Sequence, residues 1–282
     1  MEILHLDQSS VLAQLPVRNK ESHKGDYGRC LLLCGSVGYT GAPALAAMGA
    51  LRTGAGLVYV AVPESIYQIE AIKLLEPIVL PLPDKDGMFS SSATKQLAQM
   101  LPKMDAVLIG PGIGQSEGVK AVVEFVLENF SGPVVVDADG INVLKLNKDI
   151  LRGRNYPTIV TPHMGEFSRL GGNVDEDRVE AAVQLARDLN VIVVLKGHRT
   201  VITDGQTCYQ NFTGNPGMAV GGSGDVLAGV ISSLLGQKLS PINAAACGAW
   251  LHGAAADLCA KEIGEYGMLP GDYVDYLPRL MR

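Results

Sequence analysis

One carboxylate, Asp225, lies between a glycine-rich stretch and an apolar run. The stretch reads Asn215-Pro-Gly-Met-Ala-Val-Gly-Gly-Ser-Gly-Asp225, and the run continues to Leu235 with apolar residues at helical spacing. Because glycine is disfavoured inside helices and strands, we expect a flexible loop that opens a buried helix. The backbone amides of Gly222, Ser223 and Gly224 would then be unpaired in the first turn. Together with the helix dipole, such amides form a site for an anion such as phosphate.

A carboxylate beside a phosphate site repels the ligand unless it takes part in the chemistry. The chemistry that suits Asp225 is removal of a proton from a hydroxyl that attacks phosphorus. The alternative is an acidic residue that only stabilises the start of a helix, which is common. Three glycines in four positions, at 221, 222 and 224, favour a functional role, because a bulky anion can then approach the backbone closely.

The rest of the chain predicts the elements that hold this loop. Short apolar runs ending in glycine or polar residues alternate with helical patterns, which is typical of an α/β fold with a mainly parallel sheet and helices on both faces. Strands are predicted at 30–34, 57–62, 78–80, 106–109, 133–136, 158–160 and 191–195, a hairpin at 200–203 and 207–211, and a last helix at 241–261. The first 26 residues are predicted to be irregular apart from a helix near 9–15. Because no linker or change in composition divides 1–282, we expect a single domain.

Polar residues and glycines follow most of the predicted strands, and parallel strands end at the same edge of a sheet. Ligands of open α/β sheets bind at that edge, so we expect these segments to converge on a site. They are Gly35 to Ala42, Gly110 to Gly114, Asp137 to Asn142, Thr161 to Arg169 and Lys196 to Thr200. Neither G-x-x-x-x-G-K-[ST] nor a G-x-G-x-x-G after the first strand is present. A bound nucleotide would therefore use the loop before Asp225.

Some of these residues have two interpretations. Asp137 and Asp139 could hold a metal, but a turn with a helix cap is favoured. His163 and Glu166 lie three apart, and zinc lacks a third ligand there. Magnesium held by Glu166 through water fits better, and His163 could instead bond a ligand directly.

Two further polar groups are open to more than one interpretation. Lys196 with Arg199 could supply positive charge near a phosphate or could be a solvated pair. His252, in an alanine-rich helix, is expected to be a core histidine with its hydrogen bonds satisfied.

Composition excludes several classes of protein. The chain has 282 residues, 47% of them apolar and 18% charged, which suits a sheet buried on both faces, and its net charge of −6 argues against nucleic acid. No N-terminal stretch resembles a signal peptide, and the apolar segment 244–260 is short for a membrane span. Five cysteines without a C-x-x-C pair indicate reduced core residues. We expect a cytoplasmic protein without a membrane partner.

An ordered set of motifs resembles the ADP/ATP-dependent NAD(P)H-hydrate dehydratases of the ribokinase-like superfamily. The set comprises Lys24-Gly-Asp-Tyr-Gly28, Gly35-Ser-Val-Gly-Tyr-Thr-Gly-Ala-Pro43, Thr53-Gly-Ala-Gly56, Gly110-Pro-Gly112, Asp137-Ala-Asp139, Thr161-Pro-His163, Gly165-Glu-Phe167, Lys196-Gly197 and the stretch from Asn215 to Asp225. The resemblance implies repair of the S epimer of hydrated NADH or NADPH. ADP or ATP would phosphorylate the C6 hydroxyl of the ring, and phosphate would then leave.

The resemblance also implies roles for individual residues. Asp225 would be the catalytic base, and it would contact the hydrated dinucleotide together with Ala42, Gly112 and His163. The nucleotide donor would be held by Lys196, Gly197, His198, Arg199, Thr200, Gly222, Ser223 and Gly224. Mg2+ is expected on the phosphates, because charge there must be neutralised.

The resemblance leaves the donor open, since bacterial relatives usually use ADP but no residue here selects it over ATP. It further implies a homotetramer and a separate epimerase acting upstream, because the chain is too short to carry an epimerase domain as well. Two rival functions stay open. One is a small-molecule kinase of the same fold, acting on a vitamin precursor or a sugar alcohol, and the other is a non-catalytic nucleotide sensor.

Overall fold

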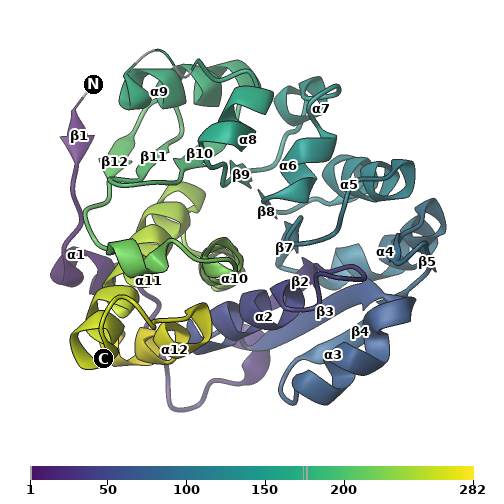
Figure 1. Ribbon diagram of the computed structural model, residues 1–282, viewed down its shortest axis with the longest axis horizontal. Coiled ribbons are helices and arrows are strands. Elements are labelled where there is room, and N and C mark those ends of the chain that lie inside the picture. The colour runs from purple at the N-terminus through teal and green to yellow at the C-terminus, as the bar shows by residue number, and fades with distance from the viewer. Residues whose placement is uncertain (1, 174, 176) are drawn as a thin grey trace.

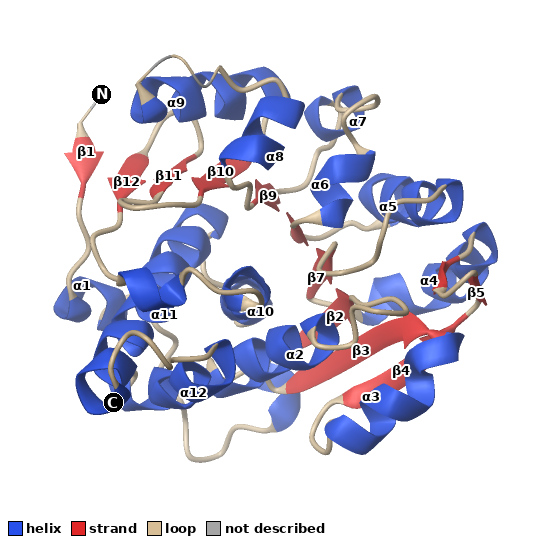
Figure 2. Ribbon diagram, viewed as in Figure 1, coloured by secondary structure: helices blue, strands red, loops and turns tan. Residues whose placement is uncertain are grey.

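Ten strands form one sheet in the order β1-β12-β11-β10-β9-β8-β7-β2-β3-β4 (Figures 1 and 2). The computed structural model describes residues 2–282 except 174 and 176. Among the ten strands of this sheet in the described residues, only β11 runs antiparallel to its neighbours, so the predicted, mainly parallel α/β sheet is confirmed. The strands are β1 (Ile3–Leu4), β2 (Arg29–Leu33), β3 (Leu57–Pro63), β4 (Ile78–Leu82), β7 (Ala106–Ile109), β8 (Val134–Val136), β9 (Thr158–Val160), β10 (Ile192–Leu195), β11 (Val201–Thr203) and β12 (Cys208–Gln210), with a separate hairpin of β5 (Asp84–Lys85) and β6 (Met88–Phe89).

Helices cover both faces of the sheet, and the strand side chains alternate between two apolar cores. In β2, Cys30 and Leu32 join the core beneath α2, α10 and α11, whereas Leu31 and Leu33 join the core beneath α4, α5 and α9. Figure 1 shows these two groups of helices on opposite sides of the strands. The helices are α1 (Gln8–Leu12), α2 (Ala42–Arg52), α3 (Tyr67–Lys73), α4 (Thr94–Met100), α5 (Glu117–Asn129), α6 (Asp139–Val143), α7 (Asp149–Arg152), α8 (Met164–Arg169), α9 (Arg178–Leu189), α10 (Ser223–Gly236), α11 (Pro241–Ile263), α12 (Pro270–Tyr273) and α13 (Leu277–Leu280).

Glycines let α2 and α10 approach each other closely. A Cβ on Gly229 would lie 2.0 Å from the Ala46 carbonyl oxygen, and one on Gly49 would lie 2.5 Å from the Val226 carbonyl oxygen. No side chain fits in either place, so both positions require glycine. This packing fixes the start of α10 beside the start of α2, on the sheet edge where the strands end.

The sequence-based prediction missed several elements. The first residues are not wholly irregular, because β1 pairs with β12 at the edge of the sheet. A strand of two residues is too short to show a periodic sequence pattern, so β1 depends on its pairing with β12. Helix α9 is the larger omission, although Asp177 caps its first turn and its apolar residues have helical spacing. No helix in the described part of the chain has the length and apolar character that a membrane span needs.

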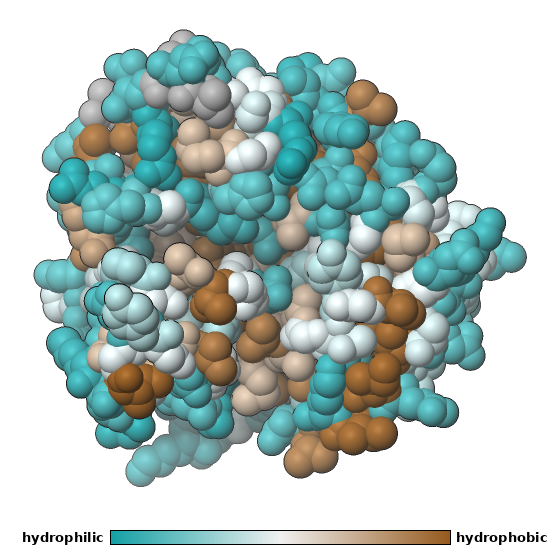
Figure 3. Space-filling model, in the orientation of Figure 1, coloured by the Kyte–Doolittle hydropathy of each residue, from teal (hydrophilic) through white to brown (hydrophobic). Residues whose placement is uncertain are grey.

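Apolar side chains are also exposed on α3, where Ile72 is 81% accessible and Ile69 is 44% accessible. Figure 3 shows brown atoms gathered over the lower right of the face, in the region where Figure 1 places α3.

Candidate active site

Helix α10 opens at Gly222, which has a φ of +96° and precedes the first helical residue, Ser223. Asp225 lies in the first turn, as predicted. The amide of Ser223 has no partner within α10, as predicted, but it donates to the Val220 carbonyl, which precedes the helix, at 3.4 Å. Within the described residues, the amides of Gly222 and Gly224 donate to no backbone carbonyl. These two remain available to an anion.

Three strand ends meet in front of this turn. Lys196, which follows β10, places Nζ 2.8 Å from Oδ1 of Asp137, which follows β8. Thr161, after β9, donates its hydroxyl to the same carboxylate oxygen at 2.6 Å. Glu166 lies 3.8 Å from Lys196 Nζ. A Cβ on Gly224 would be 3.3 Å from Lys196 Nζ, so the lysine and the mouth of α10 are in contact.

Charge and burial shift the pKa of the groups at this site. Burial raises the pKa of Asp225 to about 7, the nearby Asp137 carboxylate adds to the rise, and Lys196 opposes it. Burial acts to lower the pKa of Lys196, but Asp137, Glu166 and Asp225 together hold it above its ordinary value. Asp225 can therefore accept a proton near neutral pH, and Lys196 stays positively charged.

The proposed substrate side is built from two glycine-rich loops. Gly112 has a φ of +64°, and a Cβ there would lie 3.1 Å from that of Ala42 and 2.9 Å from that of Tyr39. The Ser36 hydroxyl donates to the Gly112 carbonyl at 2.7 Å, which ties the loops together. Ala42 and Gly112 are thus brought side by side.

His163 and Glu166 form a reciprocal cap on α8. The His163 Nδ1 accepts from the Gly165 amide at 2.9 Å, and Glu166 Oε2 accepts from the His163 amide at 2.9 Å. This fixes the ring proton on Nε2, which lies 3.3 Å from Glu166 Oε1. No group of three or more His, Cys, Asp or Glu in the described residues could hold a metal.

The loop from Lys196 to Thr200 is shaped by a residue that sequence reasoning missed. Arg178, at the start of α9, donates to the carbonyls of His198 at 2.7 Å, Leu195 at 3.2 Å and Lys196 at 3.3 Å. Gly197 has a φ of +147°, and a Cβ there would lie 3.0 Å from the Arg178 guanidinium. The contacts of Arg178 could have been anticipated only if α9 had been predicted from the sequence. Arg199 is exposed and lies over the ring of Phe212.

The interpretation of Asp137 and Asp139 as a turn with a helix cap is right about the turn, since the Gly140 amide donates to the Asp137 carbonyl at 2.9 Å and α6 follows, but it is wrong about the cap. No side chain caps α6, whose N-cap is Ala138. Asp139 instead accepts from the Gly114 amide at 3.0 Å and from Gln115 at 3.1 Å, and Asp137 pairs with Lys196. At a strand end the neighbouring loops offer donors that sequence spacing cannot show.

His252 is buried, as expected, and the backbone of Ser223 in α10 lies beside its ring. Neither its Nε2 nor the Tyr273 hydroxyl, whose ring lies edge-on at 5.4 Å, has a well-aligned hydrogen-bond partner among the described residues, but Ser223 is close enough to both side chains to affect their pKa. Burial lowers the pKa of His252 to about 4, so the ring is neutral at pH 7. All five cysteines are free and buried, as predicted.

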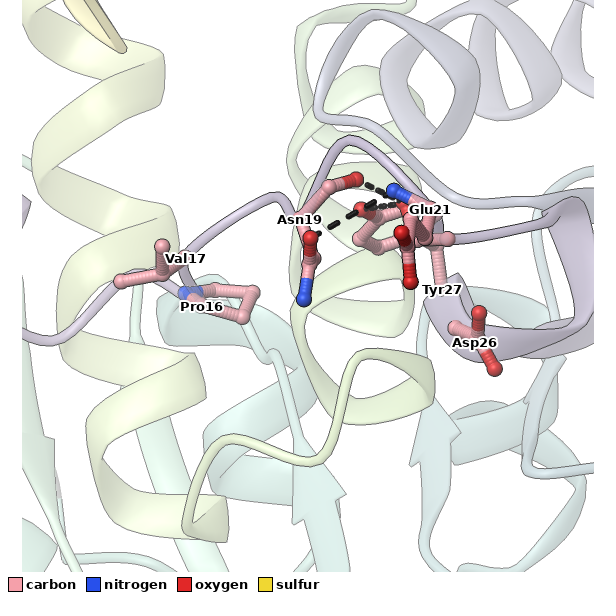
Figure 4. A pocket seen from close by; sticks show the side chains of 7 residues that line it. Pro16, Val17, Asn19, Glu21, Asp26 and Tyr27 are labelled. Atoms are coloured by element: carbon pink, nitrogen blue, oxygen red, sulfur yellow. Dashed lines mark hydrogen bonds between the residues drawn. The ribbon is translucent and has the colours of Figure 1, made fainter.

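Two of the quoted motifs lie away from this site. The segments 24–28 and 53–56 precede β2 and β3, and they join through hydrogen bonds from Gly56 to Tyr27 and from Leu57 to Gly28, both at 3.0 Å. A cavity of about 310 Å³ lies beside them, lined by residues that include Pro16, Asn19 and Tyr27 (Figure 4). A second cavity, of about 500 Å³, is lined by residues that include Gly54 and Gln237. Both cavities are at the edge where strands begin, opposite Asp225.

The chain is similar in sequence to known proteins. The pattern of the NAD(P)H-hydrate dehydratase family matches residues 30–279. The chain is 46% identical over 277 residues to a bifunctional NAD(P)H-hydrate repair enzyme of Moorella thermoacetica, covering 96% of this chain and 52% of that protein. It is 37% identical to the ADP-dependent (S)-NAD(P)H-hydrate dehydratase of Bacillus subtilis, covering 100% of this chain and 99% of that one.

A solved structure agrees with these sequence matches. The ADP/ATP-dependent NAD(P)H-hydrate dehydratase of B. subtilis, co-crystallised with ATP and Mg2+, superposes with a TM-score of 0.85 at 35% identity, covering 99% of this chain and 98% of that one. The chain thus spans about half the length of the bifunctional relative, and nearly all of the B. subtilis protein.

Proposed function

Because the chain belongs to the NAD(P)H-hydrate dehydratase family, we propose that it restores NADH or NADPH from the S epimer of its hydrate, with ADP or ATP as phosphoryl donor. The observation that carries this proposal is a half-buried carboxylate of raised pKa, Asp225, in the first turn of α10, with Lys196 beside it. Such a pair suits transfer of a phosphoryl group to a hydroxyl. The ribokinase-like fold is shared with the B. subtilis enzyme.

The chemistry has two stages. Asp225 takes the proton of the C6 hydroxyl as its oxygen attacks the terminal phosphorus, and AMP leaves from ADP, or ADP from ATP. The C6–O bond of the new phosphate ester then breaks as the ring nitrogen donates its electron pair, and inorganic phosphate leaves. Loss of a proton from the ring restores the dihydronicotinamide. Hydroxide is a poor leaving group and phosphate a good one, which is why a nucleotide is consumed.

The binding residues divide between the two ligands. Ala42, Gly112, His163 and Asp225 would contact the hydrated dinucleotide. The amides of Gly222 and Gly224, with Ser223, would receive the donor phosphates, and the loop from Lys196 to Thr200 would hold the nucleotide. The side-by-side placement of Ala42 and Gly112 and the contact of Gly224 with Lys196 support this division.

Mg2+ is proposed to arrive with the nucleotide and to neutralise charge on its phosphates. Magnesium keeps most of its ligands as water and phosphate oxygens, so a dedicated set of protein carboxylates is not needed. Glu166 is the candidate to meet one of those waters, although its two oxygens already face His163.

We further propose that residues 1–282 act as one domain, that the chain forms a tetramer in the cytoplasm, and that a separate epimerase supplies the S epimer. Exposed Ile69 and Ile72 on α3 are compatible with an assembly. The mass of the native protein in solution tests the tetramer.

The small-molecule kinase shares the transfer step and differs in the fate of the phosphorylated alcohol. Product analysis by chromatography separates the two functions. We expect one AMP and one phosphate for each NADH restored from ADP, without a lasting phosphorylated alcohol. Accumulation of a phosphorylated alcohol would favour the kinase. The nucleotide sensor predicts binding without turnover.

A further inference from the structure

The segment that leads into the α10 loop is tied to α11 by one carboxylate. Asp257, on α11, accepts from the Gly214 amide with Oδ2 at 2.8 Å and from the Asn215 side-chain amide with Oδ1 at 3.0 Å. Asn215 in turn accepts from the Gly217 amide with Oδ1 at 3.0 Å, which caps the short helix η5 (Pro216–Met218). We call Asp257 and Asn215 the clamp.

Residues before the clamp are also fixed along α11. Asn211 donates to the Ala249 carbonyl at 3.1 Å, and the Thr213 hydroxyl donates to the Trp250 carbonyl at 2.9 Å. Residues 219–221 after η5 are exposed, and a Cβ on Gly221 would meet nothing within 4 Å. Beyond η5 the Val220 amide donates to the Met218 carbonyl at 2.9 Å, and the Ser223 amide donates to the Val220 carbonyl at 3.4 Å, so backbone hydrogen bonds connect η5 to the start of α10.

The backbone at the clamp has little freedom. Gly214 has a φ of +107°, and a Cβ on Gly217 would lie 2.6 Å from the Glu265 carbonyl oxygen. The segment is therefore held on one side by the carboxylate and on the other by the loop after α11. A shift of a few tenths of an ångström at this point would move Gly222 and Gly224, whose amides face the proposed phosphate.

We propose that Asp257 is a positioning residue that acts through Asn215 to set the start of the phosphate-binding loop. The role rests on the proposed function, because it concerns the same nucleotide site. Asp257 does not touch the ligand in this account. It fixes where the amides of Gly222 and Gly224 lie relative to Asp225, so its loss weakens nucleotide binding more than binding of the hydrated dinucleotide.

The pattern of donors and acceptors gives a sharp test. In Asp257→Asn, residue 257 offers one acceptor oxygen and one NH2 group in place of two acceptor oxygens. The Gly214 and Gly217 amides both still need an acceptor, so in every orientation of the two side-chain amides one NH2 group points at another N–H donor. In the double variant Asn215→Asp with Asp257→Asn, every bond is restored with the charge moved to position 215. The Asp225 base and Lys196 are untouched in both.

The experiment measures ADP binding by calorimetry in the presence of Mg2+, steady-state kinetics with hydrated NADH, and the melting temperature. For Asp257→Asn we expect the Kd and KM for ADP to rise roughly tenfold, as for one unsatisfied polar contact, with the KM for hydrated NADH unchanged. The double variant should return within about threefold of the wild type by the same reasoning. Asp272→Asn, which removes a carboxylate bonded to the Leu269 amide nearby, serves as the matched control and should bind ADP normally.

Other results overturn the role. ADP binding unchanged in Asp257→Asn, or still weak in a double variant that melts like the wild type, contradicts positioning through these hydrogen bonds. Equal weakening of both substrates, or failure of the single variant to fold, assigns Asp257 a purely structural part. If the wild type itself binds neither ADP nor ATP, the nucleotide site fails, and the clamp's role fails with it.

Discussion

At the scale of single residues, the proposed site depends on one candidate base, Asp225, and the charges around it. Asp225 is half-buried, and this partial burial raises its pKa to about 7, with Asp137 adding to the rise and Lys196 opposing it. Lys196 is itself held by Asp137 at 2.8 Å. Lys196 therefore holds the Asp137 carboxylate in place and lowers the pKa of Asp225.

Replacing Asp225 by asparagine removes the base and keeps the shape of the side chain. We expect kcat to fall about 10²- to 10⁴-fold, the contribution typical of a general base, while ADP still binds. Steady-state kinetics and calorimetry measure the two effects. Glu128→Gln, an exposed carboxylate on α5, is the charge-matched control. Full activity of Asp225→Asn would remove the base from this account.

The pH dependence follows from the direction of the pKa shift. Asp225 accepts a proton only when ionised, so kcat/KM should rise with pH through a midpoint near 7. Lys196→Met removes the charge that lowers this pKa, so the midpoint should move to higher pH. A profile flat from pH 5 to 8 in the wild type, or a midpoint that moves down in the variant, would contradict the assignment.

Sequence reasoning found Asp225, Lys196 and the strand-end residues because glycine and apolar spacing reveal loops and helices. It did not find that Asp137 pairs with Lys196, since 59 residues separate them and only the sheet order joins their strands. His252 was expected to be a satisfied core histidine, and the structure confirms its burial but gives its Nε2 no well-aligned partner among the described residues.

At the scale of elements, the glycines at the start of α10 leave space for the proposed phosphate. Gly224 lies against Lys196, and Gly222 takes a positive φ where other residues are strained. Helix α9 contributes through Arg178, whose guanidinium holds three carbonyls of the neighbouring loop. The sequence carries a local signal for α9 in its capping residue and apolar spacing, whereas β1 has no local signal.

A side chain at position 224 tests this element. Gly224→Val should weaken ADP binding roughly tenfold or more, because its branches would fill the phosphate's approach and push on Lys196 Nζ, 3.3 Å from the first added carbon. Gly221→Ala is the control, since a Cβ there meets nothing within 4 Å. Calorimetric titration with ADP decides the matter, and equal affinity in both variants would refute the placement of the phosphate.

At the scale of the whole molecule, the two edges of the sheet have separate tasks. The carboxyl ends of the parallel strands carry the proposed site, and the segments at their amino ends are held together by a buried arginine. Arg154 donates to the carbonyls of Leu127, Phe130, Gly132, Tyr156 and Pro157 and to the Thr158 hydroxyl. Burial lowers its pKa to about 10. The position of these carbonyls depends on the fold, so no sequence pattern announces the contact.

Removing this arginine should affect stability and leave the chemistry intact. Arg154→Met leaves several buried carbonyls without a donor, so we expect a loss of roughly 3 kcal/mol or more, or about 6 °C in melting temperature at about 2 °C per kcal/mol. The Kd for ADP at low temperature should not change. If the melting temperature of the variant were unchanged, or if the variant stayed folded but lost ADP binding, the separation of stability from ligand binding would be contradicted.

The most direct measurement is the recovery of absorbance at about 340 nm, the NADH band, when the S epimer of hydrated NADH is mixed with the protein, Mg2+ and either ADP or ATP. The account predicts recovery with at least one donor, no recovery without a nucleotide, and a loss of rate in Asp225→Asn. If the folded wild-type protein binds ADP or ATP yet never restores the band, the proposed function is contradicted.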